Sequence, residues 1–364
     1  MSSKRQRLGE LGYSVGRFPR GPRNALIDVV GVRVGQVTLI EDLDDGRAVR
    51  TGVTAILPHG GNPYQEKVLG ACHVVNGYGK ATGLSQLAEL GTLESPILVT
   101  GTLSVGAAWE GGLRHTMEQN PDVGRGGGTV NVVVAECDDS YLNDARGLHV
   151  RPEHALAAVQ AASDQEVGEG SVGAGTGMTC LGFKAGVGTA SRLTLQAPAH
   201  RLGALVVANF GRRSDRHLLL GPDEGEPAED GAAEAGSVIV VLATDAPLSE
   251  RQLRRLAARA TFGLARTGSF AANASGDYVL AFSTAHRIPH RAQRPDQQFR
   301  FLRDDALAVG ELFEMAGEVT REAVLNSLCT AAAMDGRDGH HTEAFPYRLL
   351  GRALREEQPP VDSG

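Results

Sequence analysis

A Gly236-Ser237 pair stands between two stretches of opposite character. Upstream, residues 221–235 contain six acidic residues, two prolines, three glycines and four alanines, a composition typical of an exposed linker. Downstream, residues 238–242 are all apolar and mostly β-branched, which predicts a buried strand. Glycine gives the backbone the freedom to bring the serine hydroxyl onto the preceding carbonyl. This setting suggests a peptide bond that the chain cuts itself, but a strand entered from a turn would contain the same residues.

Cleavage at this bond would make Ser237 a new N-terminus. An α-amino group, with an ordinary pKa of about 7.7–8.0, can act as the base for a hydroxyl on the same residue. The expected chemistry is amide hydrolysis through an acyl-enzyme, with no metal or organic cofactor. Gly-Ser pairs also occur at Gly170-Ser171 and Gly268-Ser269, so the dipeptide alone is not specific.

Two other stretches contain polar groups that could assist such a nucleophile. Asn209 ends an apolar run at residues 205–208, and its amide could donate to an oxyanion. Ser275 and Asp277 are two residues apart, so on an extended segment both point to one side. Ser275 could then pass a proton to or from Ser237, with Asp277 orienting it. An Asn that serves a turn and an Asx turn are the simpler alternatives.

These stretches together resemble the DmpA/BapA family, peptidase family S58, which includes L-aminopeptidase/D-esterases and β-peptidyl aminopeptidases. The similarity is ordered along the chain and runs from about residue 5 to residue 350. Its strongest parts are residues 208–211, 236–248, 263–269 and 275–277, joined by residues 24–35, 173–178, 183–184, 188, 191–192 and 334–339.

The resemblance implies an α+β fold, a four-layer αββα sandwich like that of ornithine acetyltransferase. It implies cleavage before Ser237, with Ser275 and Asp277 as the serine and its acidic partner and Asn209 as the oxyanion donor. Glu136 matches an acid that holds the substrate's N-terminal ammonium, as a charge-assisted hydrogen bond would. A solvated strand end is the alternative for Glu136. The family further implies a homo-oligomer, a tetramer of α/β pairs.

The chain departs from the family pattern at three places. Asp277 stands where some members have the longer glutamate. Residues 137–139 replace a segment in which some members have a tyrosine, and Tyr141 is a candidate substitute. Residues 101–106 differ from the start that is often seen there. These differences bear on the choice of substrate rather than on the fold.

Composition along the chain, together with the resemblance, predicts the organisation of the chain. We expect an N-terminal arm at residues 1–24 and one self-processing domain at residues 25–350. An exposed linker at about residues 211–236 would separate an α chain, 1–236, from a β chain, 237–364, and residues 351–364 would form a flexible tail.

Composition excludes several classes of partner. The chain of 364 residues has a net charge of −7 and only 5 % aromatic residues, which argues against nucleic acid and anionic membranes as partners.

The four cysteines are far apart and have no metal-site spacing, which favours a reduced, cytoplasmic protein. His340 and His341 lie near two aspartates, but exposed His pairs in turns are common, and we expect no metal there.

Residue patterns also predict the individual elements. The capping box of Ser249 and Gln252 and the apolar stripe that follows predict a helix. Strands are expected within residues 25–39, 53–57, 97–100, 130–136, 205–208, 238–242 and 278–282, and further helices at residues 152–162, 304–316 and 321–334.

Two other functions are compatible with this reading. An acyltransferase of the ornithine acetyltransferase type would use a threonine nucleophile, and Ser237 weighs against it. A non-catalytic protein on the same fold would not need the polar residues described above. The favoured hypothesis is a serine aminopeptidase acting on small peptides or amino-acid amides.

Overall fold

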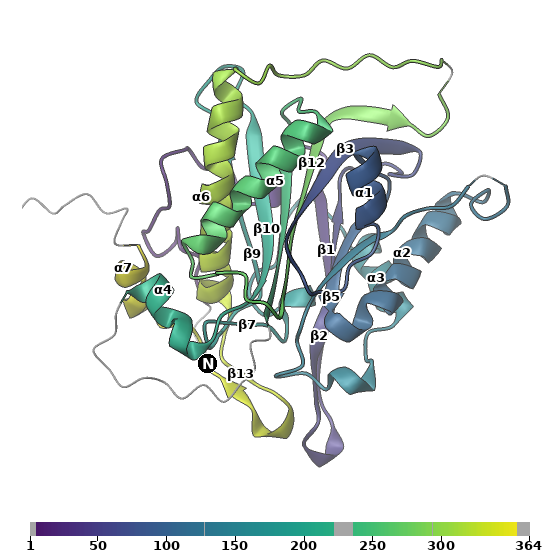
Figure 1. Ribbon diagram of the computed structural model, residues 1–364. Coiled ribbons are helices and arrows are strands. Elements are labelled where there is room, and N and C mark those ends of the chain that lie inside the picture. Colours follow the sequence, from purple (N-terminus) through teal and green to yellow (C-terminus); the bar gives the residue numbers. More distant parts are fainter. Residues whose placement is uncertain (1–4, 127, 222–235, 293, 355–364) are drawn as a thin grey trace, which may run out of the picture.

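The computed structural model describes residues 5–126, 128–221, 236–292 and 294–354, and these form four layers: helices, a sheet, a second sheet and helices (Figure 1). Helices α5 and α6 cover one sheet, and α2 and α3 cover the other. The αββα sandwich expected from the sequence is therefore confirmed.

The first sheet has four strands in the order β1-β2-β5-β6, of which β5 and β6 are parallel. The second sheet has six strands in the order β4-β3-β12-β11-β10-β9, of which β11 and β12 are parallel. Their bounds are β1 Arg33–Asp42, β2 Ala48–Leu57, β3 Glu66–Gly77, β4 Thr92–Leu93, β5 Ile97–Gly101, β6 Val133–Cys137, β9 Val187–Leu193, β10 Arg201–Asn209, β11 Gly236–Thr244 and β12 Ser275–Pro289.

The helices and the short hairpins complete the fold. The helices are α1 Leu84–Leu90, α2 Val105–Gln119, α3 Pro152–Gln160, α4 Arg216–Leu220, α5 Glu250–Ala265, α6 Leu307–Thr330 and α7 Leu350–Ala353, and the hairpins are β7 Thr179–Cys180 with β8 Phe183–Lys184, and β13 Met334–Asp335 with β14 His341–Thr342.

Strand β11 lies in the middle of the second sheet, and its apolar side chains divide between two cores. Val238, Val240 and Leu242 belong to the core under α5 and α6. Ile239 and Val241 belong to the core between the two sheets. This alternation is what an extended strand imposes when both faces of its sheet are covered. The run of apolar residues that predicted a buried strand is fully explained.

Helix α5 begins as predicted, because the Ser249 hydroxyl accepts a hydrogen bond from the Gln252 N–H and the Gln252 side chain accepts one from the Ser249 N–H. The two helices predicted at residues 304–316 and 321–334 are instead one helix, α6. The prediction was wrong because Gly317 does not end the helix. It lies where α5 crosses: a side chain on Gly263 would come within 2.4 Å of the Gly317 carbonyl.

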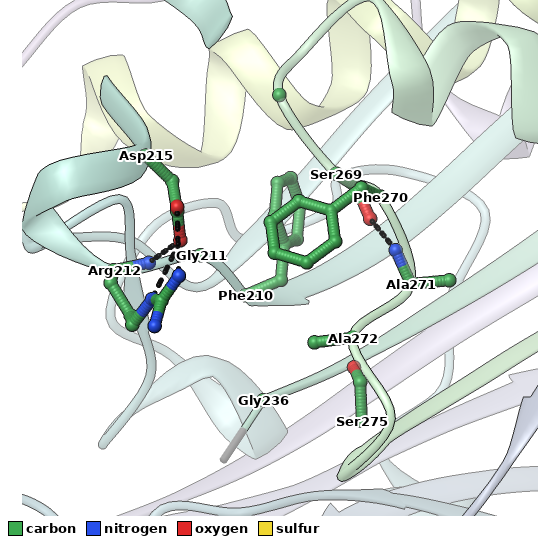
Figure 2. Close-up of a pocket in the computed structure, with 11 residues that line it drawn as sticks. Phe210, Gly211, Arg212, Asp215, Gly236, Ser269, Phe270, Ala271, Ala272 and Ser275 are labelled. Carbon is green, nitrogen blue, oxygen red and sulfur yellow. Dashed lines mark hydrogen bonds and ion pairs between the residues drawn. The ribbon is translucent and has the colours of Figure 1, made fainter. Parts of the chain in front are cut away.

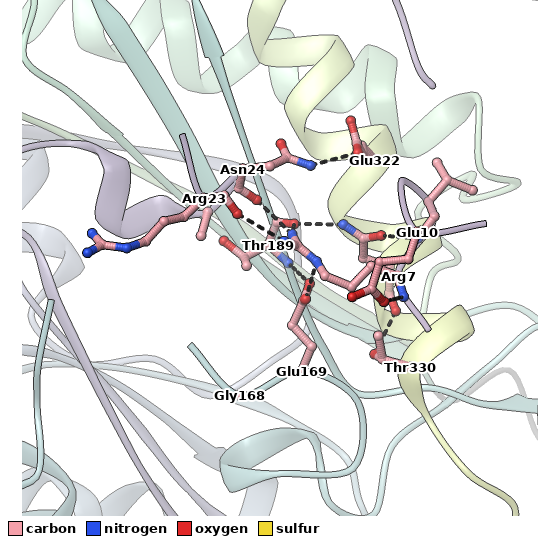
Figure 3. A network of polar contacts seen from close by, with 12 residues as sticks. Arg7, Glu10, Arg23, Asn24, Gly168, Glu169, Thr189, Glu322 and Thr330 are labelled. Carbon is pink, nitrogen blue, oxygen red and sulfur yellow. Dashed lines mark hydrogen bonds and ion pairs between the residues drawn. The ribbon is translucent and has the colours of Figure 1, made fainter. Parts of the chain in front are cut away.

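The N-terminal arm packs onto the domain from residue 5 onward. Leu8, Val15 and Phe18 are buried in the core under α6. Polar contacts fix the arm as well: Arg7 forms an ion pair with Glu169, whose side chain is 8 % exposed, and the Arg7 guanidinium donates to the Thr189 carbonyl at 2.9 Å (Figure 3). The described part of the expected arm is thus an ordered part of the fold.

A buried arginine joins this arm to helix α6, and its loss should destabilise the protein. The Arg192 guanidinium lies 3.1 Å from Glu318, also pairs with Glu322, and donates to the Val15 carbonyl at 2.6 Å. Replacing Arg192 by methionine leaves buried carboxylates with fewer partners, so we expect a loss of about 3 kcal/mol in the free energy of unfolding. Urea denaturation measures it.

The matched control is Arg303→Ala, which removes an ion pair with Asp305 whose two side chains are 83 % and 70 % exposed. This loss should be below about 1 kcal/mol. Equal losses in the two variants would contradict the structural role given to Arg192.

The expected linker and the expected tail lie partly outside the described residues. The expected linker lies largely at residues 222–235, outside the described residues, but residues 216–220 form α4 and Gly236 already belongs to β11. The expected tail lies outside them from residue 355; before it, α7 and the buried Leu354 pack on the domain, so the tail boundary at residue 351 was placed too early. Among the helices that the structure describes, none has the length and apolarity needed to cross a bilayer.

Candidate active site

Ser237 is the second residue of β11, and its hydroxyl contacts the carbonyl of the peptide bond that precedes it. The Oγ donates to the Gly236 oxygen at 2.5 Å. The side chain is 2 % exposed. Ser237 is two residues before Ile239 on the strand, so both side chains point to the same face of the sheet, toward the first sheet. The hydroxyl of Ser237 is therefore next to the carbonyl group that it would have to attack.

Asn209 lies directly across from Ser237. Strands β10 and β11 are antiparallel, and their register pairs these two residues. The Asn209 Oδ1 accepts a hydrogen bond from the Thr179 N–H, and its Nδ2 donates to the Asp138 carbonyl, both at 2.9 Å. These two partners fix which way the amide points. The nitrogen has two hydrogens, so one is left for an oxyanion.

Ser275 and Asp277 approach from the other neighbouring strand. The parallel register of β11 and β12 pairs Gly236 with Ser275 and Val238 with Asp277. The Ser275 Oγ donates to Asp277 Oδ1 at 2.7 Å, so the contact predicted from their spacing is confirmed. A side chain on Gly236 would lie 3.5 Å from the Ser275 Oγ. The pair therefore lies against the same peptide bond.

The electrostatics of Asp277 suit a group that must be ionised to work near neutral pH. Burial raises the pKa of Asp277 to about 6, because desolvation disfavours the charged form. The Ser275 hydroxyl and the Val238 N–H oppose this rise in pKa by hydrogen bonding to the carboxylate. Asp277 is thus a carboxylate above about pH 6 and a carboxylic acid below it.

Glu136 lies near the end of β6, the strand of the first sheet that packs against β11. Its Oε1 accepts a hydrogen bond from the Lys80 N–H at 2.9 Å, and the Lys80 Nζ is 4.0 Å away. Its other oxygen, Oε2, is buried and has no hydrogen-bond partner of good geometry among the described residues. Burial raises the pKa of Glu136. The alternative of a solvated strand end does not hold, because the side chain is 1 % exposed.

Two glycines connect Glu136 to the nucleophile. A side chain on Gly79 would lie 2.9 Å from Glu136 Oε1 and 2.9 Å from the Cα of Gly276. A side chain on Gly276 would lie 3.4 Å from the Ser237 Oγ. Glycine at both positions lets these elements approach closely, so the carboxylate and the hydroxyl are near one another.

Two residues that hold this arrangement could not be identified from the sequence. The Asn76 amide donates to the carbonyls of Ala272 and Asn273, at 2.9 and 3.1 Å, and so fixes the loop before Ser275. The Tyr278 hydroxyl donates to the Gly79 carbonyl at 2.7 Å. Neither residue belongs to a motif, and only the fold brings them to the site.

Tyr141, the candidate substitute for a family tyrosine, contacts His340. Its ring stacks on His340 with a centroid distance of 4.5 Å, and it is 43 % exposed. The His340 Nδ1 also contacts the Tyr141 carbonyl at 2.6 Å. This histidine is therefore part of a surface stack, and within the described ranges no group of three or more His, Cys, Asp or Glu side chains could bind a metal.

A pocket lies beside the Gly236-Ser237 bond (Figure 2). Gly236 and Ser275 form one side of it, and the ion pair of Arg212 and Asp215 lies on another side. The remaining lining comes from the end of β10 and the loop before β12, residues Phe210, Gly211, Gly268, Ser269, Phe270, Ala271 and Ala272. The pocket that adjoins Gly236 is thus mostly apolar.

The sequence-predicted residues meet around one peptide bond. Ser237 supplies a hydroxyl at that bond, Asn209 an amide donor across from it, and Ser275 with Asp277 a hydroxyl and a carboxylate on its other side. Such a set can carry out acyl transfer to a hydroxyl, with a donor for the oxyanion and a route for the proton.

Comparison with known proteins also indicates a peptidase. The model of peptidase family S58 matches residues 24–342. The β-peptidyl aminopeptidase BapA of Sphingosinicella microcystinivorans is 37 % identical over 377 residues, covering 98 % of this chain and 93 % of BapA.

Solved structures agree over nearly the whole length. The PH0078 protein of Pyrococcus horikoshii superposes with a TM-score of 0.87 at 47 % identity, covering 96 % of this chain and 99 % of that one. The L-aminopeptidase D-Ala-esterase/amidase of Ochrobactrum anthropi, described as a variant of the Ntn hydrolase fold, superposes with a TM-score of 0.85 at 35 % identity, covering 96 % and 98 %.

Proposed function

We propose, from the premise that the chain belongs to peptidase family S58 and is an aminopeptidase, that it activates itself by cutting the Gly236-Ser237 bond. The observation that supports this most directly is the contact of the Ser237 Oγ with the Gly236 carbonyl. The residues around that bond then serve twice, first in self-cleavage and then in hydrolysis of substrates.

Self-cleavage begins with attack of the Ser237 Oγ on the carbonyl carbon of Gly236. Ser275, oriented by Asp277, takes up the hydroxyl proton, and Asn209 donates to the oxyanion. The C–N bond breaks as the proton passes to the departing Ser237 nitrogen, which leaves an ester between Gly236 and Ser237. Water hydrolyses this ester. The products are a carboxylate on Gly236 and a free amine on Ser237.

Hydrolysis of a substrate repeats these steps with the amine as an added base. The Ser237 Oγ attacks the carbonyl of the substrate's first residue, the leaving amine takes a proton, and water releases the acyl group. The names of the relatives suggest small peptides or amides with a free N-terminus as substrates. Glu136 would hold that ammonium, because its buried Oε2, which lacks a hydrogen bond of good geometry, gains a charged donor.

Glu136→Gln separates the two reactions. The substrate's ammonium loses its ionic partner, so kcat/KM on an aminoacyl p-nitroanilide should fall about 10- to 100-fold. Self-cleavage involves no free ammonium and should keep its rate. Time courses on denaturing gels and a nitroaniline assay measure the two. Equal losses in both reactions would contradict the role proposed for Glu136.

The pH profiles of the two reactions should differ as well. Asp277 acts as a carboxylate, so self-cleavage should rise as the pH increases through about 6. Hydrolysis also needs the neutral Ser237 amine, so it should show a second rise near pH 8, about the ordinary α-amino pKa. In Asp277→Asn, self-cleavage should be slow and lack the inflection near pH 6. A wild-type rate that is flat from pH 5 to 8 would overturn this assignment.

We further propose that the α chain, residues 1–236, and the β chain, residues 237–364, stay together and form a homo-oligomer. The extensive pairing of β11 with β10 and β12 supports a stable association of the two chains after the cut. Light scattering on the mature protein tests the oligomer, and a mass equal to one α/β pair would contradict it.

A further inference from the structure

Lys184 is a charged residue in the core without an acidic partner. It is fully buried, and within the described part of the chain it forms no salt bridge. Its Nζ donates instead to the carbonyls of Gly175, Met178 and Ala185, at 3.3, 2.8 and 2.6 Å. Three acceptors require three hydrogens, which only the protonated ammonium has.

Burial of this ammonium is unfavourable because it removes the charge from water. Desolvation lowers the pKa of Lys184 to about 7. An apolar side chain would fill the same space without this cost. The reason for a lysine at this position must therefore lie in the carbonyl groups that its ammonium contacts.

The peptide between Met178 and Thr179 connects Lys184 to Asn209 in the candidate active site. The Met178 carbonyl accepts from the Lys184 Nζ and, at 3.2 Å, from the Ala185 N–H. The same peptide unit ends in the Thr179 N–H, which donates to Asn209 Oδ1 at 2.9 Å. One peptide thus has an ammonium at its oxygen and the Asn209 side chain at its hydrogen.

A cation on a peptide oxygen draws electron density toward that oxygen and makes the N–H a stronger donor. The stronger bond to Asn209 Oδ1 polarises the side-chain amide in the same sense. The hydrogens on Asn209 Nδ2 then carry more positive charge. This is the property that an oxyanion donor needs.

We infer that Lys184 is a positioning residue for both reactions: through the Met178-Thr179 peptide it orients and polarises Asn209 as the oxyanion donor. The inference rests on the role proposed for Asn209 above. Lys184 is 25 positions from Asn209 in the sequence and acts through one peptide, so the sequence does not show the link between the two residues.

A purely structural role for Lys184 would be to hold the hairpin of β7 and β8. Main-chain contacts already do this: Cys180 pairs with Phe183, and the Leu181 N–H donates to the Phe210 carbonyl at 2.8 Å. The Lys184 N–H itself donates to the Glu343 carbonyl at 2.8 Å. None of these contacts needs a charged side chain.

The test is the rate of self-cleavage of the full chain at pH 6.5, followed on denaturing gels. Lys184→Met should slow it about tenfold, because the donor is less polarised and less well held. In the mature form the same variant should lower kcat with KM nearly unchanged. Lys67→Met is the matched control: Lys67 is a mostly buried lysine beside Glu94 at the far end of β3, and its loss should leave the rate as it is.

A double-mutant cycle with Asn209→Ala separates this inference from a structural effect. If Lys184 acts through Asn209, adding Lys184→Met to Asn209→Ala should change the rate by less than about twofold. A further tenfold loss would overturn the inference. So would a wild-type rate for Lys184→Met when Asn209→Ala is slow. If Asn209→Ala itself cuts at the wild-type rate, the proposed function of Asn209 fails first.

Folding is checked on the same variants by thermal unfolding. If Lys184→Met does not fold, Lys184→Gln replaces it, since glutamine keeps a neutral N–H donor in the core. A folded Lys184→Gln that cuts at the wild-type rate would also overturn the inference, because the charge would then be dispensable.

Discussion

Ser237→Ala should remain one uncut chain and should hydrolyse no aminoacyl p-nitroanilide above background. The hydroxyl that contacts the Gly236 carbonyl is then gone, and so is the free amine that cleavage would create. Loss of a nucleophile of this kind costs about 10⁶-fold in kcat. Denaturing gels and a nitroaniline assay on the same preparation give both results.

The control is a second Gly-Ser pair in the same chain. Gly170-Ser171 lies in a loop where Gly170 has a φ of +81°, and the Ser171 Oγ is buried. Ser171→Ala should cut itself and hydrolyse substrate like the wild type. A Ser237→Ala protein that still yields two fragments would show that another residue or a contaminating protease makes the cut.

Asn209→Ala should slow self-cleavage and substrate turnover together, each by about 10²- to 10³-fold. Both reactions pass through an oxyanion at the same place, and the amide opposite Ser237 is the donor proposed for it. KM should change little, because this donor acts mainly in the transition state.

Single-turnover self-cleavage and steady-state kinetics measure the two effects of Asn209→Ala. A variant that raises KM at an unchanged kcat would instead mark Asn209 as a group that binds the ground state. A loss in turnover alone, with normal self-cleavage, would mean that the two reactions use different oxyanion donors.

The elements that could be predicted from sequence are those with strong local signals. β11 was predicted from its apolar run, and α5 from the Ser249 cap and its stripe. Strand β3 and helix α2 were missed. β3 mixes buried and half-exposed residues without alternation, and α2 contains three glycines that weaken a helical pattern. Their states are set by the layers they pack between.

The site could be predicted in its parts but not in its assembly. Local sequence suggested Ser237, Asn209 and the contact of Ser275 with Asp277. Nothing in the sequence alone shows that β11 lies between β10 and β12, or that the register places Asn209 opposite Ser237. Residues 183–184 contributed to the family resemblance, but the role of Lys184 could not be predicted for the same reason, since its carbonyl partners are known only from the fold.

The cut before Ser237 precedes every other step proposed for this enzyme, and the intact mass of the purified protein under denaturing conditions tests it most directly. We expect two chains with the masses of residues 1–236 and 237–364, the second with the N-terminal sequence Ser-Val-Ile-Val. A single uncut chain in a preparation that hydrolyses aminoacyl amides would contradict the account, because activity would then not need the amine of Ser237.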